Sequence, residues 1–97
     1  MYVALICRDK PGHLQVRLDT RPAHVDFLEG LNAEGRLALA GPLIGADGKP
    51  NGSIVILNVD TVDEARDLAA RDPYAKAGLF DNVDISQWNW TFNAPGA

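Results

Sequence analysis

The apolar residues of the chain gather in four short runs. The runs cover residues 2–8, 36–41, 53–59 and 83–92, and each has the length and the apolar or β-branched content typical of a strand. The second run is expected to stop at Pro42, and the turn-forming residues 46–52 predict a long hairpin connection to the third. In the last run the apolar positions change phase at residues 86–87, which predicts a β-bulge.

A helix is predicted between the first two runs. Thr20 is placed to cap its N-terminus, and Pro22 suits the first turn, where the missing N–H costs nothing. The apolar face has the i, i+3, i+4, i+7 spacing of a half-buried helix and consists of His24, Phe27, Leu28 and Leu31. We therefore expect a helix from Arg21 that is ended by Gly35, with a histidine at the head of its apolar stripe.

A second helix is predicted after the third run, where Thr61 and Glu64 have the spacing of a capping box. Its apolar face consists of Ala65, Leu68 and Ala69, and the same spacing reaches Asp72. Pro73 disfavours helical geometry at the residue before it, so the helix is expected to end at Asp72. A further helical turn is expected over residues 74–78.

The order of these elements, β-α-β-β-α-β, is that of the ferredoxin-like fold. It predicts one α+β domain over residues 1–97, with a four-stranded antiparallel sheet in the order 4-1-3-2 and both helices on one face. Antiparallel helices place the start of the first and the end of the second at the same edge of the sheet. His24 and Asp72 both lie there, on core-facing positions where an ionisable side chain is costly unless it is paired. The topology therefore predicts that these two residues meet.

The first three strand runs alternate too little for a sheet with one face in water. The helices cover one face, and the other face needs a second cover. A second copy of the chain, packed sheet to sheet, is the simplest cover, so we expect a homodimer. Trp88 and Trp90 are candidate anchors of that interface.

Charge and composition exclude several classes of partner. The chain has 97 residues, with 9 Lys and Arg against 13 Asp and Glu, which gives a net charge of −4. It lacks the basic excess that nucleic acids and anionic membranes require, so neither is an expected partner. Because it has no apolar stretch of about 20 residues and no signal-peptide pattern, we expect a cytoplasmic protein.

The sequence gives no indication of a metal or a cofactor. One cysteine and two histidines are too few for a disulfide or a dedicated metal cage. Cys7 is expected to be a small buried hydrophobe, and His13 to be solvated. Residues 45–52 lack the spacing of a phosphate-binding loop, so nucleotide binding has no support.

His24 and Asp72 are the candidate catalytic residues. A carboxylate that accepts a hydrogen bond from one ring nitrogen fixes the tautomer and leaves the other nitrogen free as a general base or acid. The pair resembles two members of a hydrolase triad, in which Ser53 is the nearest candidate nucleophile. Structural interpretations are also open: a satisfied histidine at the rim of the core, an Asp that caps the turn at Pro73, and a turn hydroxyl at Ser53.

Other residues near this edge have two interpretations each. Arg21 either binds an anionic substrate or forms an ion pair with Asp72, and Arg8 shares this ambiguity. Gly41 and Pro42 end a strand, although a residue without a side chain also lets a ligand approach the backbone.

Six short motifs span nearly the whole chain. They are Arg21-Pro22-Ala23-His24, Glu34-Gly35-Arg36-Leu37, Ala40-Gly41-Pro42, Gly52-Ser53, Asp72-Pro73-Tyr74 and Ala77-Gly78. Together they resemble the YciI-like (YCII-related) family of small bacterial proteins. The resemblance implies a ferredoxin-like chain of the dimeric α/β-barrel superfamily, with a pocket centred on a histidine and an aspartate proposed as catalytic. Those roles fall here on His24 and Asp72.

The resemblance also implies a class of activity. One relative is a dehydrochlorinase of chlorinated-aromatic breakdown, and the superfamily includes muconolactone isomerases and cofactor-free monooxygenases. We therefore expect a cofactor-free lyase or isomerase that moves a proton on a small polar unsaturated substrate in an apolar pocket. The residues expected to hold that substrate are Arg21, Ser53, Gly41, Pro42 and Tyr74. The alternatives are a non-catalytic ligand-binding or accessory domain, and a structural dyad in a protein that functions through oligomer contacts.

Overall fold

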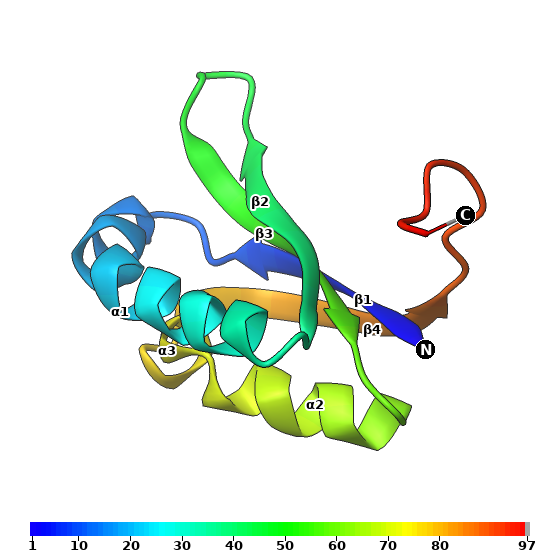
Figure 1. Ribbon diagram of the computed structural model, residues 1–97. Helices are drawn as coiled ribbons and strands as arrows, with labels where there is room; N and C mark the ends of the chain where they lie inside the picture. The colour runs from blue at the N-terminus through cyan, green and yellow to red at the C-terminus, as the bar shows by residue number, and fades with distance from the viewer. Residues whose placement is uncertain (97) are drawn as a thin grey trace.

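The computed structural model describes residues 1–96. It forms a four-stranded antiparallel sheet in the order β2-β3-β1-β4, with the helices on one face (Figure 1). The strands are β1 (Tyr2–Asp9), β2 (Leu37–Ile44), β3 (Pro50–Asn58) and β4 (Phe80–Trp88), and the helices are α1 (Leu14–Ala33), α2 (Val62–Arg71) and α3 (Pro73–Lys76). The predicted ferredoxin-like α+β fold and its strand order are confirmed.

The core lies between the sheet and the helices. Side chains alternate along β1, so that Val3, Leu5 and Cys7 are buried in this core while their neighbours along the strand point to the other face. The other buried members of the cluster are Leu31 of α1, Val55 and Leu57 of β3, Val59, and Ala65 and Leu68 of α2. Cys7 is 3% exposed, which confirms the prediction of a small buried hydrophobe.

The first helix begins seven residues earlier than predicted, at Leu14. Pro22 therefore lies inside α1, and Thr20 is not its N-cap. A proline in a helix interior offers no N–H to the carbonyl four residues earlier, which here belongs to Leu18. Leu18 lies on the exposed side of the helix, where water can satisfy that carbonyl, so the helix continues through the proline. The additional turns bring Arg17 onto the buried face of α1.

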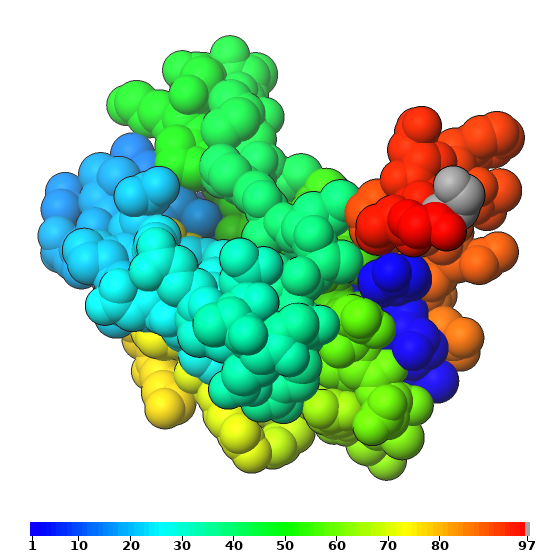
Figure 2. Space-filling view, in the orientation of Figure 1, coloured from blue at the N-terminus to red at the C-terminus, as the bar shows by residue number. Residues whose placement is uncertain are grey.

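Two strands extend beyond their predicted ends. β2 continues through Pro42 to Ile44, and β3 begins at Pro50 rather than at Ser53. Because β2 is an edge strand, a missing N–H can face away from the neighbouring strand, and Pro42 is tolerated opposite Ser53. The hairpin that joins the two strands, with residues 45–49 at its tip, projects beyond the body of the molecule (Figure 2).

β4 begins and ends earlier than predicted, and its register irregularity lies at its start instead of at residues 86–87. The change of phase in the sequence has another cause. Ile85 pairs with Leu5, whose side chain is in the core, whereas Trp88 pairs with Tyr2 on the opposite face. The apolar pattern of β4 therefore moves from one face of the sheet to the other without a bulge at that point.

Thr61 caps α2 as predicted, but the carboxylate of Glu64 bonds the residue before the cap and not Thr61 itself. The backbone N–H of Glu64 donates to Thr61 Oγ1 at 3.1 Å, and the Glu64 carboxylate accepts from the backbone N–H of Asp60 at 3.0 Å. The helix ends at Arg71, and Asp72 then connects it to α3, whose first residue is Pro73. Within residues 1–96, no helix has the length and apolar character needed to cross a membrane.

Gly52 allows β3 to pass close to β1 just before Ser53. A Cβ atom at this position would approach the carbonyl oxygen of Cys7 more closely than real Cβ atoms do, and would also press on Leu43. This close approach of β3 to β1 therefore requires glycine, which gives the Gly52-Ser53 motif a physical reason.

Candidate functional site

His24 and Asp72 are in direct contact, as the topology predicts. His24 Nδ1 lies 2.9 Å from Oδ1 and 3.1 Å from Oδ2 of Asp72, and the two residues are 8% and 6% exposed. An ionised carboxylate only accepts hydrogen bonds, so Nδ1 carries the proton and donates a hydrogen bond to Asp72. Within residues 1–96 every buried polar side-chain atom has a partner, and none is found for His24 Nε2, which is therefore accessible. The pair leaves Nε2 as the nitrogen that can exchange a proton with a ligand.

The backbone fixes the position of the Asp72 carboxylate. Its Oδ1 also accepts from the backbone N–H of Tyr74 at 2.9 Å, which caps the first turn of α3. The capping interpretation of Asp72 and its interpretation as the partner of His24 therefore hold at the same time.

Tyr74 packs against the imidazole. The rings of Tyr74 and His24 are stacked, with centroids 3.9 Å apart and planes inclined by 18°, and Arg17 Cζ lies 4.6 Å from the Tyr74 centroid. Arg17 and His24 are separated by two turns of α1, a rise of about 10 Å that accommodates the ring between them. Burial raises the pKa of Tyr74 against the opposing charges of Arg17 and Arg21, so the phenol stays protonated at neutral pH.

Arg17, which precedes the predicted start of the helix, is the centre of a buried network. Its Nε and Nη2 donate to the two carboxylate oxygens of Asp9 at 2.7 and 2.8 Å, and Nη2 also donates to Ser53 Oγ at 3.0 Å. The side chains of Arg17 and Asp9 are 5% and 6% exposed. Burial alone would lower the pKa of Arg17, but the hydrogen bond and charge of Asp9 outweigh it and raise that pKa above its ordinary value. The guanidinium is permanently charged and held in one orientation.

The sequence contains a signal for Arg17 that Pro22 obscures. Arg17, His24 and Leu31, the buried residues of α1, recur every seven residues, which is the spacing of one helix face. Because proline is typical of a first turn, the pattern places the residues before Pro22 in a loop and leaves Arg17 outside the stripe.

A pocket of about 200 Å³ opens beside these groups, lined by residues of α1, β2, β3 and α3. The residues predicted to hold a substrate all line it: Arg21, Gly41, Pro42, Ser53 and Tyr74. His24 and Arg17 contribute the other polar groups, and the remaining walls are Val25, Leu28, Ala40 and Val55. The structure thus brings the predicted residues to one cavity, where the role of each stays a prediction.

The two interpretations of Arg21 have different outcomes. Arg21 is exposed and forms no ion pair within residues 1–96, so the alternative of a pair with Asp72 is wrong. His24 occupies the Asp72 carboxylate instead. Arg21 keeps its charge available beside the pocket, where it acts on Tyr74.

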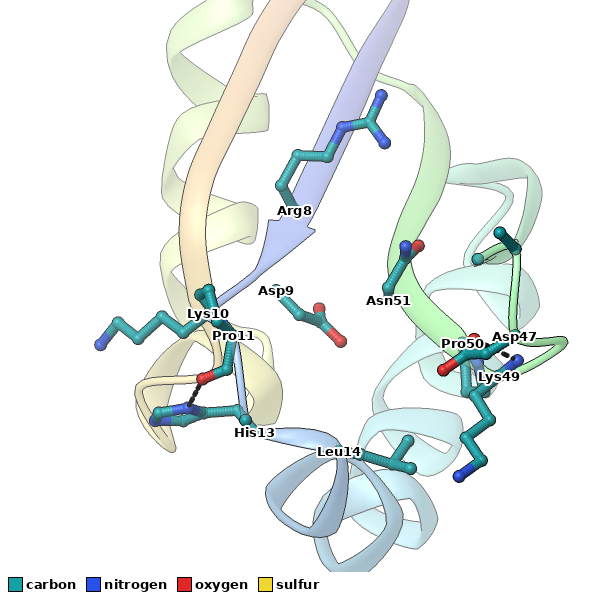
Figure 3. A pocket seen from close by; sticks show the side chains of 13 residues that line it. Arg8, Asp9, Lys10, Pro11, His13, Leu14, Asp47, Lys49, Pro50 and Asn51 are labelled. Carbon is teal, nitrogen blue, oxygen red and sulfur yellow. Dashed lines mark hydrogen bonds between the residues drawn. The ribbon is translucent and has the colours of Figure 1, made fainter.

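A larger cleft of about 610 Å³ lies between the β1–α1 connection and the β2–β3 hairpin (Figure 3). Arg8, Lys10 and Lys49 belong to its lining, but Figure 3 shows these side chains pointing in different directions, so they do not converge on one anion position. His13, in the same lining, is partly exposed, and its Nδ1 lies 2.9 Å from the carbonyl oxygen of Pro11. Asp9 lines this cleft and binds Arg17, which lines the smaller pocket.

Cys7 lies in the core opposite Ser53, and its thiol is held in the unreactive protonated form. Burial, reinforced by the charge of Asp72, raises the pKa of its thiol to about 12. The part of the chain that the structure describes has no group of three or more His, Cys, Asp or Glu side chains that could hold a metal ion.

Comparisons with known proteins identify the family of the chain. The family model of the YCII-related domain matches residues 1–89. Protein YciI of Escherichia coli O6:H1 is 34% identical over 98 residues, which cover 95% of this chain and 100% of that protein. A protein of Emericella nidulans, "Derivative of benzaldehyde biosynthesis cluster protein C", is 33% identical over 72 residues, 67% of this chain and 74% of the relative.

A solved structure is similar over nearly the whole chain. It is that of 5-chloro-2-hydroxyhydroquinone dehydrochlorinase (TftG) from Burkholderia phenoliruptrix in complex with 2,5-dihydroxybenzoquinone. The sequence identity is 35%, the match covers 92% of this chain and 94% of that chain, and the TM-score is 0.84. The chain belongs to the YCII-related family.

Proposed function

We propose that this chain is a cofactor-free enzyme of the lyase or isomerase type, in which His24 transfers a proton on a small unsaturated or aromatic-derived substrate. The observation that carries the proposal is the buried His24–Asp72 pair, whose accessible Nε2 belongs to a residue lining the 200 Å³ pocket. Its similarity to a dehydrochlorinase supports the same reaction class.

The proposed reaction depends on proton transfer to and from His24 Nε2. His24 Nε2 takes the proton of a C–H bond that is conjugated with a carbonyl, and the electron pair of that bond moves through the conjugated system onto the oxygen. Asp72 stabilises the imidazolium that forms. Elimination of halide from a halogenated hydroquinone uses the same groups. The ring carbon that bears the halogen takes a proton to give the keto tautomer, His24 Nε2 removes the proton of a conjugated hydroxyl, and the electron pair of that O–H bond moves through the ring to expel the halide as an anion and leave a quinone. The imidazolium then gives its proton to solvent. In an isomerisation, the imidazolium returns the proton to a different carbon.

The pocket limits the size of the substrate. At about 200 Å³ it is smaller than the roughly 300–1,000 Å³ typical of sites for drug-sized ligands, so it suits a single ring. Val25 and Leu28 offer apolar surface to such a ring, and Arg21 supplies positive charge for an oxygen substituent. The 2,5-dihydroxybenzoquinone bound by the dehydrochlorinase has this character, and we take it as the test ligand, called the quinone probe below.

The direct test is chloride release from 5-chloro-2-hydroxyhydroquinone by the wild type and by His24→Gln. The glutamine amide still donates to Asp72, so the buried carboxylate keeps a partner. Loss of a general base is expected to lower the rate by about 10²- to 10⁴-fold. His13→Gln, outside the pocket, is the matched control and should retain the wild-type rate. Equal turnover by His24→Gln and the wild type contradicts the proposal.

A ligand-binding domain without catalysis is the second candidate function. The buried donors of Arg17 and Ser53, with Arg21 beside them, would serve recognition as well as chemistry. In that case the wild type binds the quinone probe but releases no chloride, and His24→Gln binds it as the wild type does.

We also propose that two copies of the chain pair through the sheet face opposite the helices. Tyr2 lies on that face and forms an aromatic cluster with Trp88 and Trp90, with ring centroids 5.4–6.4 Å apart. Trp88 is 37% exposed and Phe92 82% exposed, and exposed aromatic side chains beside an apolar sheet favour a partner. A two-fold axis places the same cluster on both sides of the interface.

Sedimentation equilibrium tests the pairing. The wild type is expected to be a dimer at micromolar concentration, and Trp88→Asp is expected to shift it toward monomer, while Leu18→Asp on the exposed side of α1 leaves it dimeric. A monomeric wild type contradicts the pairing.

A further inference from the structure

Ser53 is the buried hydroxyl of the pocket, and the proposed proton transfer gives it no task. It lies on β3, next to Gly52 and opposite Pro42 of β2, and is 4% exposed. Its Oγ accepts a hydrogen bond from Arg17 Nη2 at 3.0 Å. This contact occupies a lone pair of the oxygen and leaves the hydroxyl hydrogen to be donated elsewhere. The sequence left three roles open for this residue: a nucleophile, a turn hydroxyl and a substrate contact.

The partner of Ser53 argues against a nucleophile. A serine becomes nucleophilic when a neighbouring base takes its proton. Here the neighbour is a guanidinium, which has donors only and cannot accept a proton. The hydrogen bond from Arg17 also draws electron density from Oγ, which makes the oxygen a poorer nucleophile and the O–H a stronger donor.

The orientation of Arg17 does not depend on a ligand. Nε and Nη2 are held by both oxygens of the buried Asp9, so the guanidinium presents Nη2 to Ser53 before any substrate arrives. Stacking on Tyr74 holds it from another side. Since the Arg17–Asp9 pair is neutral as a whole, its effect on a ligand passes through the hydroxyl that it orients.

The geometry points to Ser53 as the hydrogen-bond donor to a substrate oxygen on which negative charge develops, with Arg17 as the residue that positions its hydroxyl. This inference rests on the proposed function. It assigns the ligand class more narrowly, because the substrate must present toward Ser53 the carbonyl or hydroxyl oxygen on which negative charge develops, while the proton to be transferred faces His24 Nε2. When the proton leaves, the electron pair moves onto that oxygen, and a donor already aimed at it stabilises the charge without reorganisation.

Two substitutions and their combination test this assignment. Ser53→Ala removes the donor, and Arg17→Lys keeps the positive charge beside Asp9 but loses the fixed fork of the guanidinium. Arg66→Lys, at an exposed position outside the pocket, is the matched control for Arg17→Lys. The readouts are kcat and KM for chloride release and the Kd of the quinone probe by calorimetry, with a thermal melt of each variant to show that it is folded.

Ser53→Ala is expected to lower kcat by about 10²- to 10³-fold, the usual cost of one donor to a developing oxyanion. Arg17→Lys should lower kcat less, and it should add little to Ser53→Ala, because it acts through the same hydroxyl. If the fold-decreases in kcat of the two single variants multiply in the double variant, the positioning role of Arg17 is overturned. An unchanged kcat in Ser53→Ala would overturn the donor role.

The same measurements separate this inference from the proposed function. A wild type whose turnover depends on His24 but not on Ser53 refutes the inference alone, whereas a wild type without turnover or probe binding refutes the proposed function and the inference with it. Treatment with an aryl fluorophosphonate gives a test that needs no substrate. No adduct on Ser53 is expected by mass spectrometry, and a covalent adduct on Ser53 would show a nucleophile and overturn the donor role.

Discussion

Replacing Arg17 by methionine removes one partner of the buried Arg17–Asp9 pair and leaves the other. The two side chains are 5% and 6% exposed and are joined by two hydrogen bonds of 2.7 and 2.8 Å. An uncompensated buried charge costs about 3–5 kcal/mol. For a domain of this length, each kcal/mol lowers the melting temperature by about 4–8 °C, so Arg17→Met is expected to melt at least about 12 °C below the wild type.

The assay is urea unfolding followed by circular dichroism, with two comparisons from the same chain. Arg71 and Asp67 form an exposed pair one helical turn apart, with side chains 58% and 62% exposed, so Arg71→Met should change the free energy of unfolding by at most about 0.5 kcal/mol. The double variant Arg17→Met with Asp9→Leu removes both buried charges and should recover most of the loss. An Arg17→Met variant as stable as Arg71→Met would refute the view that Arg17 is locked in a buried network.

Three further predictions concern the core and the close approach of β3 to β1. Cys7 should resist iodoacetamide at pH 8 in the folded protein and react once urea unfolds it, since burial holds the pKa of its thiol at about 12; rapid labelling of the native chain would be contrary to this. Because burial raises the folded-state pKa of Cys7 from its ordinary value of 9.0 to about 12, and raises the pKa of Tyr74 as well, stability should fall as the pH rises from about 9 toward 12, and a flat profile of unfolding free energy would contradict both shifts. Gly52→Ala should destabilise the fold by forcing β3 away from β1, whereas Gly30→Ala, in open space on α1, should stabilise it by about 0.5–1 kcal/mol; chemical denaturation that ranks the two variants the other way would exclude a close approach at Gly52.

The fold and the meeting of His24 with Asp72 could be predicted because they depend on coarse features of the sequence. Element order determines the topology, and antiparallel helices bring the start of one and the end of the other to the same edge. Both residues also occupy positions where a helix face is otherwise apolar. Such positions tolerate an ionisable side chain only in a pair, so the pattern of burial carried the chemical information.

The Arg17 network could not be predicted, because local and tertiary preferences disagree in this segment. Pro22 is typical of a first helical turn, but α1 continues through it, since the carbonyl that loses its partner lies on the solvent side. Arg17 then binds Asp9 of β1 and Ser53 of β3, which lie 8 and 36 residues away from it in the sequence. A buried arginine becomes recognisable only when the elements that hold its partners have been placed.

The central claim is that Asp72 sets the tautomer of His24 and leaves Nε2 free, and nitrogen-15 NMR of the imidazole at alkaline pH tests it most directly. The wild type is expected to show the proton on Nδ1. Asp72→Leu removes both carboxylate oxygens that face Nδ1, at 2.9 and 3.1 Å, so no side-chain acceptor then holds the proton on that nitrogen. The proton of His24 should therefore move to Nε2 in the variant. A wild-type proton on Nε2, or the same tautomer in both proteins, would contradict the account.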